Sequence, residues 1–210
     1  LAIFFSSMII SIDHMTQVSD QWLDTKKELL FSEYRASHDI MTGLWNKTSG
    51  MDQVRNCLEN MLENDAAVLG FVDIDNFKSV NDTYGHGTGD FWIREIAAAL
   101  QEMCGSSDIA CRYGGDEFII VIESCSRYEL ENIAKDIYAR IAEADGFSCQ
   151  IKKYLNHDVE FKEEKNITCS IGISYERNVT SESQITELIK KADDLMYTVK
   201  TGEKGHYAFF

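Results

Sequence analysis

Two adjacent carboxylates follow two adjacent glycines at a predicted chain reversal, and these residue types could do chemistry together. The stretch Cys111–Glu123 reads C-R-Y-G-G-D-E-F-I-I-V-I-E, with Asp116 and Glu117 directly after Gly114 and Gly115. A glycine pair between β-branched and aromatic runs predicts a hairpin. A tip without side chains lets a ligand approach the main chain, and carboxylates bind hard cations. Taken alone, the four residues are explained more simply as a solvated acidic turn.

A second polar cluster follows the apolar run at 66–72, which predicts a central strand covered on both faces. From Asp73 the sequence reads D-I-D-N-F-K, and Asn81 and Asp90 follow further along, the latter closing G-H-G-T-G-D. Two acidic clusters at the ends of neighbouring strands would meet around a divalent metal ion, because carboxylate oxygens are the ligands that hard cations prefer. The two clusters together therefore predict a metal site.

These blocks closely resemble the GGDEF domain family of diguanylate cyclases. The resemblance rests on R-Y-G-G-D-E-F, on F-V-D-I-D-N-F-K-S-V-N-D-T-Y-G-H-G-T-G-D and on the earlier D-I-M-T-G-L-W-N-K, in family order from about Asp39 to the C-terminus. It implies an α/β (α+β) fold of nucleotidyl-cyclase or palm type, with a mostly antiparallel central sheet flanked by helices. It also implies condensation of two GTP molecules into cyclic di-GMP and pyrophosphate, with Mg²⁺ or Mn²⁺ as cofactor.

The resemblance assigns the catalytic and metal-binding roles residue by residue. The signature comprises Gly114, Gly115, Asp116 and Glu117, and the metal ligands are Asp73, the main-chain carbonyl of Ile74, Asp116 and Glu117. This set agrees with the preference of Mg²⁺ for a few protein oxygens completed by substrate phosphates. Which carboxylate accepts the proton of the attacking hydroxyl stays open.

The remaining family positions would contact the nucleotide. Asn81 and Asp90 match the positions that read guanine, whose N1-H and N2-H₂ edge calls for an amide and a carboxylate, and Asp90 favours GTP. The implied phosphate contacts are Lys78, Lys200, Lys204 and the main-chain amides around Asn76 and Phe77. Lys204 stands where the family usually has arginine, so the bidentate fork is lost. The plainer explanations are a turn residue for Asn81, a helix cap for Asp90 and surface solubility for each lysine.

One regulatory motif of the family is incomplete. Many members carry R-x-x-D ahead of the signature as a product-binding site, and this chain has G-S-S-D from Gly105 to Asp108. A bound guanine and phosphate need the missing cation. The sequence therefore predicts weak or absent product inhibition at this site.

Composition limits the partners. The 210 residues carry a formal net charge of -15 and a pI of about 4.7, which argues against binding nucleic acid, since that requires a basic face. The same field would repel a triphosphate unless divalent cations and local lysines offset it. The six cysteines form no C-x-x-C pair, which predicts reduced thiols in a cytoplasmic protein.

Two segments are expected, an N-terminal segment with a signalling helix at 1–37 and a catalytic domain at 38–210. Leu1–Ile12 is too short to span a bilayer, and it fits either the tail of a membrane helix that begins upstream or a buried or partner-facing helix end. A heptad seam follows at Met15, Val18, Trp22, Thr25, Leu29, Ser32 and Ala36. It predicts either a helix that pairs two copies downstream of a missing sensor or an amphipathic helix that folds back on its own domain.

Periodicity places the other elements. Helices are expected around 51–62, 89–103, 130–141 and 185–199, and strands at 109–113, 118–122, 167–175 and 206–210, with 147–161 ambiguous between one and two strands. Strands that alternate with helices predict a single sheet covered by helices.

Three functions fit these residues. The leading hypothesis is an active, homodimeric cyclase that takes GTP and forms the output end of a signalling protein, at the inner face of the membrane if the N-terminal segment is an anchor. The alternative is a non-catalytic module that binds GTP or a cyclic dinucleotide, although the complete signature with Asp73, Asn81 and Asp90 argues against it. A cyclase with relaxed nucleotide choice would differ in its product alone.

Overall fold

A computed structural model describes residues 2–59, 66–124, 168–177, 179, 181–202 and 204–209, together with positions 132, 135 and 139. The chain divides into two compact units, Leu1–His38 and Asp39–Phe210. The helix expected at 130–141 lies almost entirely outside the described residues, and the ambiguous segment at 147–161 lies wholly outside them.

The first unit is one long helix, α1 (Ala2–Ser37). Its heptad positions keep large apolar side chains in solvent, with exposed fractions of 73% for Met15, 62% for Trp22 and 58% for Leu29. The helix ends with the ring of Tyr34 stacked on His38 at 4.2 Å. None of the helices in the described part of the chain has both the length and the apolar content that a membrane span requires.

The second unit is built on a six-stranded mixed sheet with strand order β1-β3-β4-β2-β5-β6. Its strands are β1 (Trp45–Asn46), β2 (Ala66–Ile74), β3 (Ile109–Arg112), β4 (Glu117–Ser124), β5 (Cys169–Arg177) and β6 (Tyr207–Phe209). The three pairings that involve β2 or β4 are antiparallel, while the edge strands β1 and β6 pair in parallel. The predicted mostly antiparallel central sheet is therefore confirmed.

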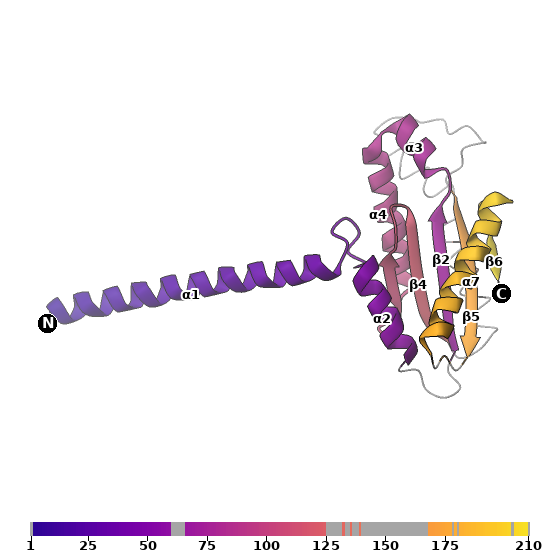
Figure 1. The fold of residues 1–210 in the computed structure, drawn as a ribbon. Helices are drawn as coiled ribbons and strands as arrows, with labels where there is room; N and C mark the ends of the chain where they lie inside the picture. Colours follow the sequence, from indigo (N-terminus) through magenta and orange to yellow (C-terminus); the bar gives the residue numbers. More distant parts are fainter. Residues whose placement is uncertain are drawn as a thin grey trace. The chain divides into compact units, whose positions relative to one another are not determined.

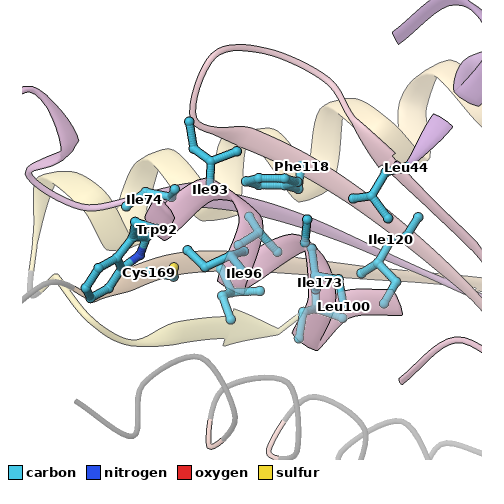
Figure 2. Close-up of a cluster of buried hydrophobic side chains, with 14 of the residues drawn as sticks. Leu44, Ile74, Trp92, Ile93, Ile96, Leu100, Phe118, Ile120, Cys169 and Ile173 are labelled. Atoms are coloured by element: carbon cyan, nitrogen blue, oxygen red, sulfur yellow. The ribbon is translucent and has the colours of Figure 1, made fainter. Parts of the chain in front are cut away.

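Helices cover both faces of this sheet (Figure 1), with α2 (Lys47–Glu59) and α7 (Glu182–Thr201) on one face and α4 (His86–Met103) on the other. Figure 2 shows the buried cluster between α4 and the sheet, which includes Trp92, Ile96 and Leu100. The second cluster lies under α2 and α7 and includes Leu69 and Phe71 of β2. Burial of both faces explains why β2 reads as an unbroken apolar run.

The sequence patterns did not predict two short elements. Helix α3 (Phe77–Tyr84) begins after Asn76, which adopts left-handed angles with φ of 57°, and it buries a single side chain, Val80. Strand β1 has two residues, too few for an alternating pattern. The described cysteines, Cys57, Cys104, Cys111 and Cys169, are free thiols.

Close packing at Gly172 fixes the position of α7 on the sheet. A Cβ atom built on Gly172 of β5 would lie 1.9 Å from the carbonyl oxygen of Ala192 and 2.3 Å from the amide nitrogen of Met196. The helix backbone therefore lies directly on the strand, because glycine alone leaves the space. This contact determines where the end of α7, with Lys200, reaches the sheet.

Candidate active site

The candidate site lies where the end of β2 meets the turn between β3 and β4, residues 113–117, which we call the hairpin tip. In the antiparallel register Asp73 is paired with Glu117, and the amide of Ile74 donates to the carbonyl of Asp116 at 3.1 Å. The structure thus brings together the four residues predicted to bind metal. The two acidic clusters are far apart in the sequence, but the strands that carry them, β2 and β4, are hydrogen-bonded to each other.

At the hairpin tip, space requires a glycine at Gly114 but not at Gly115, and backbone angles require one at neither position. Positive φ occurs at Gly43, Gly85 and Gly205 among the described glycines, and not at Gly114 or Gly115. A Cβ atom on Gly114 would lie 2.3 Å from Oε2 of Glu117, whereas one on Gly115 would meet nothing within 4 Å. The tip therefore holds the Glu117 side chain close to the main chain of Gly114 and leaves an open approach at Gly115.

Among the predicted metal ligands, Asp73 has the most deeply buried carboxylate. It is 2% exposed, its Oδ2 accepts a hydrogen bond from Nζ of Lys200 at 2.7 Å, and its Oδ1 is buried with no hydrogen-bond partner in the described part of the chain. Burial raises the pKa of Asp73 to about 6, with Lys200 opposing the shift and the carboxylates of Asp116 and Asp75 adding to it. Buried polar atoms are almost always paired, so an unpaired carboxylate oxygen indicates a place for a cation.

The donor set fits a divalent metal ion of the Mg²⁺ type. Such ions take one or two carboxylates and complete their shell with water and phosphate oxygens. Within the described ranges no three His, Cys, Asp or Glu side chains are grouped closely enough to hold a metal ion, so the carboxylates of Asp73, Asp116 and Glu117 do not form such a group in this structure. Asp73, the carbonyl of Ile74 and the carboxylates of Asp116 and Glu117 are the residues that would hold it.

Asp75, two residues along the chain, has hydrogen-bond partners for both of its carboxylate oxygens. It is fully buried, its Oδ1 accepts from the Ser170 hydroxyl at 2.7 Å, and its Oδ2 accepts from the Thr168 hydroxyl at 2.6 Å and the Gly205 amide at 3.0 Å. These bonds join the end of β2 to the start of β5 and to the turn after α7. Sequence analysis missed this role, since the letters D-I-D do not distinguish the two aspartates.

The predicted guanine-reading residues lie at the contact between α3 and α4. Asn81 is within α3, and its Oδ1 is buried without a hydrogen-bond partner in the described residues. A Cβ atom on Gly89 of α4 would lie 2.0 Å from this oxygen. Asp90 is half-buried beside Gly89, and the residue at the cap of α4 is Gly85. The turn explanation of Asn81 and the cap explanation of Asp90 are therefore wrong.

The predicted phosphate contacts surround the start of α3. Asn76 precedes the helix and Phe77 is its first residue, so their main-chain amides are at a helix N-terminus, where anions are favoured. Nζ of Lys204 donates to Oδ1 of Asn76 at 3.1 Å, while Lys78 is exposed. Lys200 is the exception, because its ammonium reaches across to Asp73.

Comparison with known proteins decides the family. The profile of the family described as "Diguanylate cyclase, GGDEF domain" matches residues 36–206. The chain belongs to the GGDEF domain family. This agrees with the resemblance seen in the sequence blocks and with the sheet that carries them.

Curated relatives of this GGDEF chain are larger proteins. Cyclic di-GMP phosphodiesterase PdeR of Escherichia coli (strain K12) is 31% identical over 175 residues, which cover 83% of this chain and 24% of PdeR. Probable diguanylate cyclase DgcE of the same organism is 32% identical over 188 residues, which cover 89% of this chain and 16% of DgcE. The chain thus spans less than a quarter of the length of either relative.

Solved structures share the fold of this GGDEF chain. The coiled coil and GGDEF domain of DgcB from Caulobacter crescentus, in complex with c-di-GMP, has a TM-score of 0.72 at 22% identity, covering 94% of this chain and 97% of that one. Diguanylate cyclase SiaD from Pseudomonas aeruginosa, in complex with its activator SiaC, has a TM-score of 0.66 at 22% identity, covering 100% and 76%. These likenesses establish the fold.

Arg112 ties the hairpin tip of the GGDEF domain to a distant block, and sequence analysis did not single it out. Its guanidinium donates to both oxygens of Asp39, at 3.1 and 3.2 Å, and to the carbonyl of Gly115 at 2.8 Å. Asp39 also accepts from the amide and hydroxyl of Thr42. Burial alone would raise the pKa of Asp39, but Thr42 and Arg112 outweigh it and lower the pKa.

Lys47 and Asp108 each make a contact of their own. The ammonium of Lys47 lies 3.9 Å from the ring centroid of Tyr113, at the start of the hairpin tip, so a cation–π contact forms there. At the incomplete R-x-x-D motif, the Asp108 carboxylate accepts from the Gly105 amide at 2.6 Å. Asp108 therefore closes a local turn, and the absence of product inhibition stays a prediction.

Proposed function

We propose that this chain is a diguanylate cyclase that condenses two GTP molecules into cyclic di-GMP and pyrophosphate, with Mg²⁺ or Mn²⁺ as cofactor. The observation that carries the proposal is Oδ1 of Asp73, a buried carboxylate oxygen with no hydrogen-bond partner among the described residues, beside the intact G-G-D-E tip. Such an oxygen costs stability in the absence of a cation, which a purely structural aspartate would not do. Family membership supplies the reaction class.

The reaction joins the two nucleotides through phosphodiester bonds. The 3′-oxygen of one GTP attacks the α-phosphorus of the other, the bond from that phosphorus to the bridging oxygen breaks, and pyrophosphate leaves with the electron pair. A second such step closes the ring. A bound divalent cation neutralises charge on the phosphate oxygens. Asp116 and Glu117 are the two candidates for accepting the hydroxyl proton, since both are at the hairpin tip beside Asp73.

The chain's own residues would orient the nucleotide. Asn81 and Asp90 would pair with the guanine edge from α3 and α4, and the unpaired Oδ1 of Asn81 is the acceptor left for the base. The phosphates would contact Lys78, Lys200, Lys204 and the main-chain amides of Asn76 and Phe77. Positioning of this kind supplies most of the rate gain in phosphoryl transfer.

Activity would require two copies of the chain. Each domain at 38–210 would hold one GTP, so two sites must face each other for the attack. The seam from Met15 to Ala36 on α1 is exposed in its own unit and would pair the copies under control of an upstream sensor. We place the protein in the cytoplasm, at the inner face of the membrane if the segment that contains Leu1–Ile12 is an anchor.

A non-catalytic module that binds GTP or a cyclic dinucleotide is the second candidate. One observation favours it, namely that a relative with 31% identity is named a cyclic di-GMP phosphodiesterase rather than a cyclase. Similarity in this region therefore accompanies different activities, and turnover must be measured.

The test is to incubate the purified chain at high concentration with GTP and Mg²⁺ and to identify the nucleotides by chromatography. We expect cyclic di-GMP from the wild type, none from Asp116→Ala and none with ATP as the sole nucleotide. The matched control is Asp52→Ala, which removes an exposed acid paired with Arg55, and it should retain activity. Bound GTP without any product would contradict the cyclase and favour the binding module.

A further inference from the structure

Lys200 has two incompatible tasks in this site. Family resemblance assigns it to the phosphates of GTP, yet in the structure its ammonium is 2.7 Å from Oδ2 of Asp73. The same carboxylate is the first predicted metal ligand. In the structure the Lys200 ammonium is therefore bound to a predicted metal ligand.

The two partners differ in their freedom to move. The side chain of Lys200 is 36% exposed and that of Asp73 is 3% exposed, so the carboxylate is fixed in the protein while the lysine stem is partly in solvent. The backbone of α7 is fixed on β5 by the close contact at Gly172. A change of partner would therefore need only rotation of the Lys200 side chain, which is fast compared with catalysis.

Charge around Asp73 explains why the lysine is there. Asp116 and Asp75 both add negative potential at Asp73 and at Lys200. The hydrogen bonds that Asp75 accepts from Thr168, Ser170 and Gly205 come from neutral groups, so these partners bring no positive charge to the site. An ammonium at Oδ2 offsets part of this potential, while Oδ1 is left without a partner.

We propose that the Lys200 ammonium pairs with Oδ2 of Asp73 in the nucleotide-free protein, where it supplies positive charge in place of a divalent cation at Oδ1, and leaves for the triphosphate when GTP binds. This inference rests on the proposed function. Because Lys200 and a divalent cation would share one carboxylate and repel each other, the protein without nucleotide binds free metal poorly. Lys200 is thus a positioning residue that couples metal binding to nucleotide binding.

The test measures metal binding without turnover. Mn²⁺ is titrated into the full chain without nucleotide, and free Mn²⁺ is followed by electron paramagnetic resonance. We expect Lys200→Gln to bind Mn²⁺ more tightly than the wild type by on the order of tenfold, a usual size for coupling between two sites. Gln keeps an N–H donor toward Asp73, and a circular-dichroism melt confirms that the variant is folded.

Two further variants locate the effect. Lys191→Gln removes the same charge from the same helix, where Lys191 is 28% exposed and pairs with Glu176 and Glu187, and it should bind Mn²⁺ as the wild type does. Adding Asp73→Asn to Lys200→Gln should abolish the gain. With an unreactive GTP analogue present, the wild type should gain more Mn²⁺ affinity than Lys200→Gln does.

Equal or weaker Mn²⁺ binding by folded Lys200→Gln would overturn the inference, as would an equal gain in Lys191→Gln. This outcome is separable from failure of the proposed function. If the chain makes cyclic di-GMP but Lys200→Gln does not change its Mn²⁺ affinity, the inference alone is refuted. If Lys200→Gln binds Mn²⁺ more tightly but the wild type makes no cyclic di-GMP, the proposed enzyme activity alone is refuted.

Discussion

Asp73 and Asp75 are two residues apart, both almost fully buried, and opposite in their surroundings. Asp75 accepts three hydrogen bonds, from Thr168 just before β5, from Ser170 of β5 and from Gly205 after α7. In the described part of the chain, Asp73 has one ion pair and one oxygen without a hydrogen-bond partner. The first arrangement stabilises the fold, and the second leaves binding capacity for a ligand. Unsatisfied bonding capacity, rather than burial or charge, distinguishes the two carboxylates.

The largest expected effect is on catalysis at Asp73. Asp73→Asn should lower the rate of cyclic di-GMP formation by at least about 100-fold, as removal of one charge-stabilising group does in other active sites. The unfolding free energy should change by less than about 1 kcal/mol, because the weakened ion pair with Lys200 is offset by removal of a buried charge whose Oδ1 has no partner among the described residues. Rates come from chromatography of product and stability from urea unfolding. Retained activity in Asp73→Asn would contradict a role for Asp73 in catalysis.

Asp75 should show the reverse pattern. Asp75→Ala leaves the Ser170 hydroxyl and the Gly205 amide without their acceptor, so we expect a loss of about 3 kcal/mol in unfolding free energy. Ser170→Ala removes one of the three bonds and serves as the graded control, with a loss of about 1 kcal/mol. A urea midpoint for Asp75→Ala equal to that of the wild type would contradict the structural role.

Asn81, a predicted guanine contact, also has a buried side-chain oxygen with no hydrogen-bond partner among the described residues. Asn81→Ala should raise KM for GTP by about tenfold, the value of one hydrogen bond, with little change in stability. Gly89→Ala should act in the same direction, since its Cβ would lie 2.0 Å from Oδ1 of Asn81. Steady-state kinetics decide the point, and an unchanged KM in both variants would remove Asn81 from the site.

The smallest effect concerns Asp39, a satisfied carboxylate like Asp75 but 25% exposed. Its folded-state pKa lies below the ordinary 3.8, so its charged form contributes stability above that pH and loses it as the pH falls through the lowered pKa. Asp39→Asn should cost about 1 kcal/mol at pH 7. The difference from the wild type should shrink below pH 3.8, measured by urea unfolding at several pH values. A gap independent of pH would exclude this ion pair as its cause.

The sequence predicts the parts of this molecule that follow regular patterns. The apolar run of β2 and the glycine pair before Asp116 predict the strands that meet at the site, and the family blocks predict which residues gather there. The short helix α3 was missed because it buries only Val80 and so has no apolar stripe.

Partners that depend on the fold could not be predicted. Arg112 pairs with Asp39, 73 residues earlier, and Asp75 pairs with residues 93 to 130 positions later. Residue letters do not specify such contacts, and the letters D-I-D treat Asp73 and Asp75 alike. The tertiary hydrogen bonds, set by strand register, assign the two aspartates to different tasks.

The most direct test of the central claim is a crystal structure of the chain with Mg²⁺ and a GTP analogue that cannot release pyrophosphate. We expect Oδ1 of Asp73 at about 2.1 Å from the metal ion, as Mg²⁺ coordination requires. Asp75 should keep its bonds to Ser170 and Gly205. A metal ion bound to Asp75, or a bound nucleotide with Oδ1 of Asp73 still unpaired, would contradict the account.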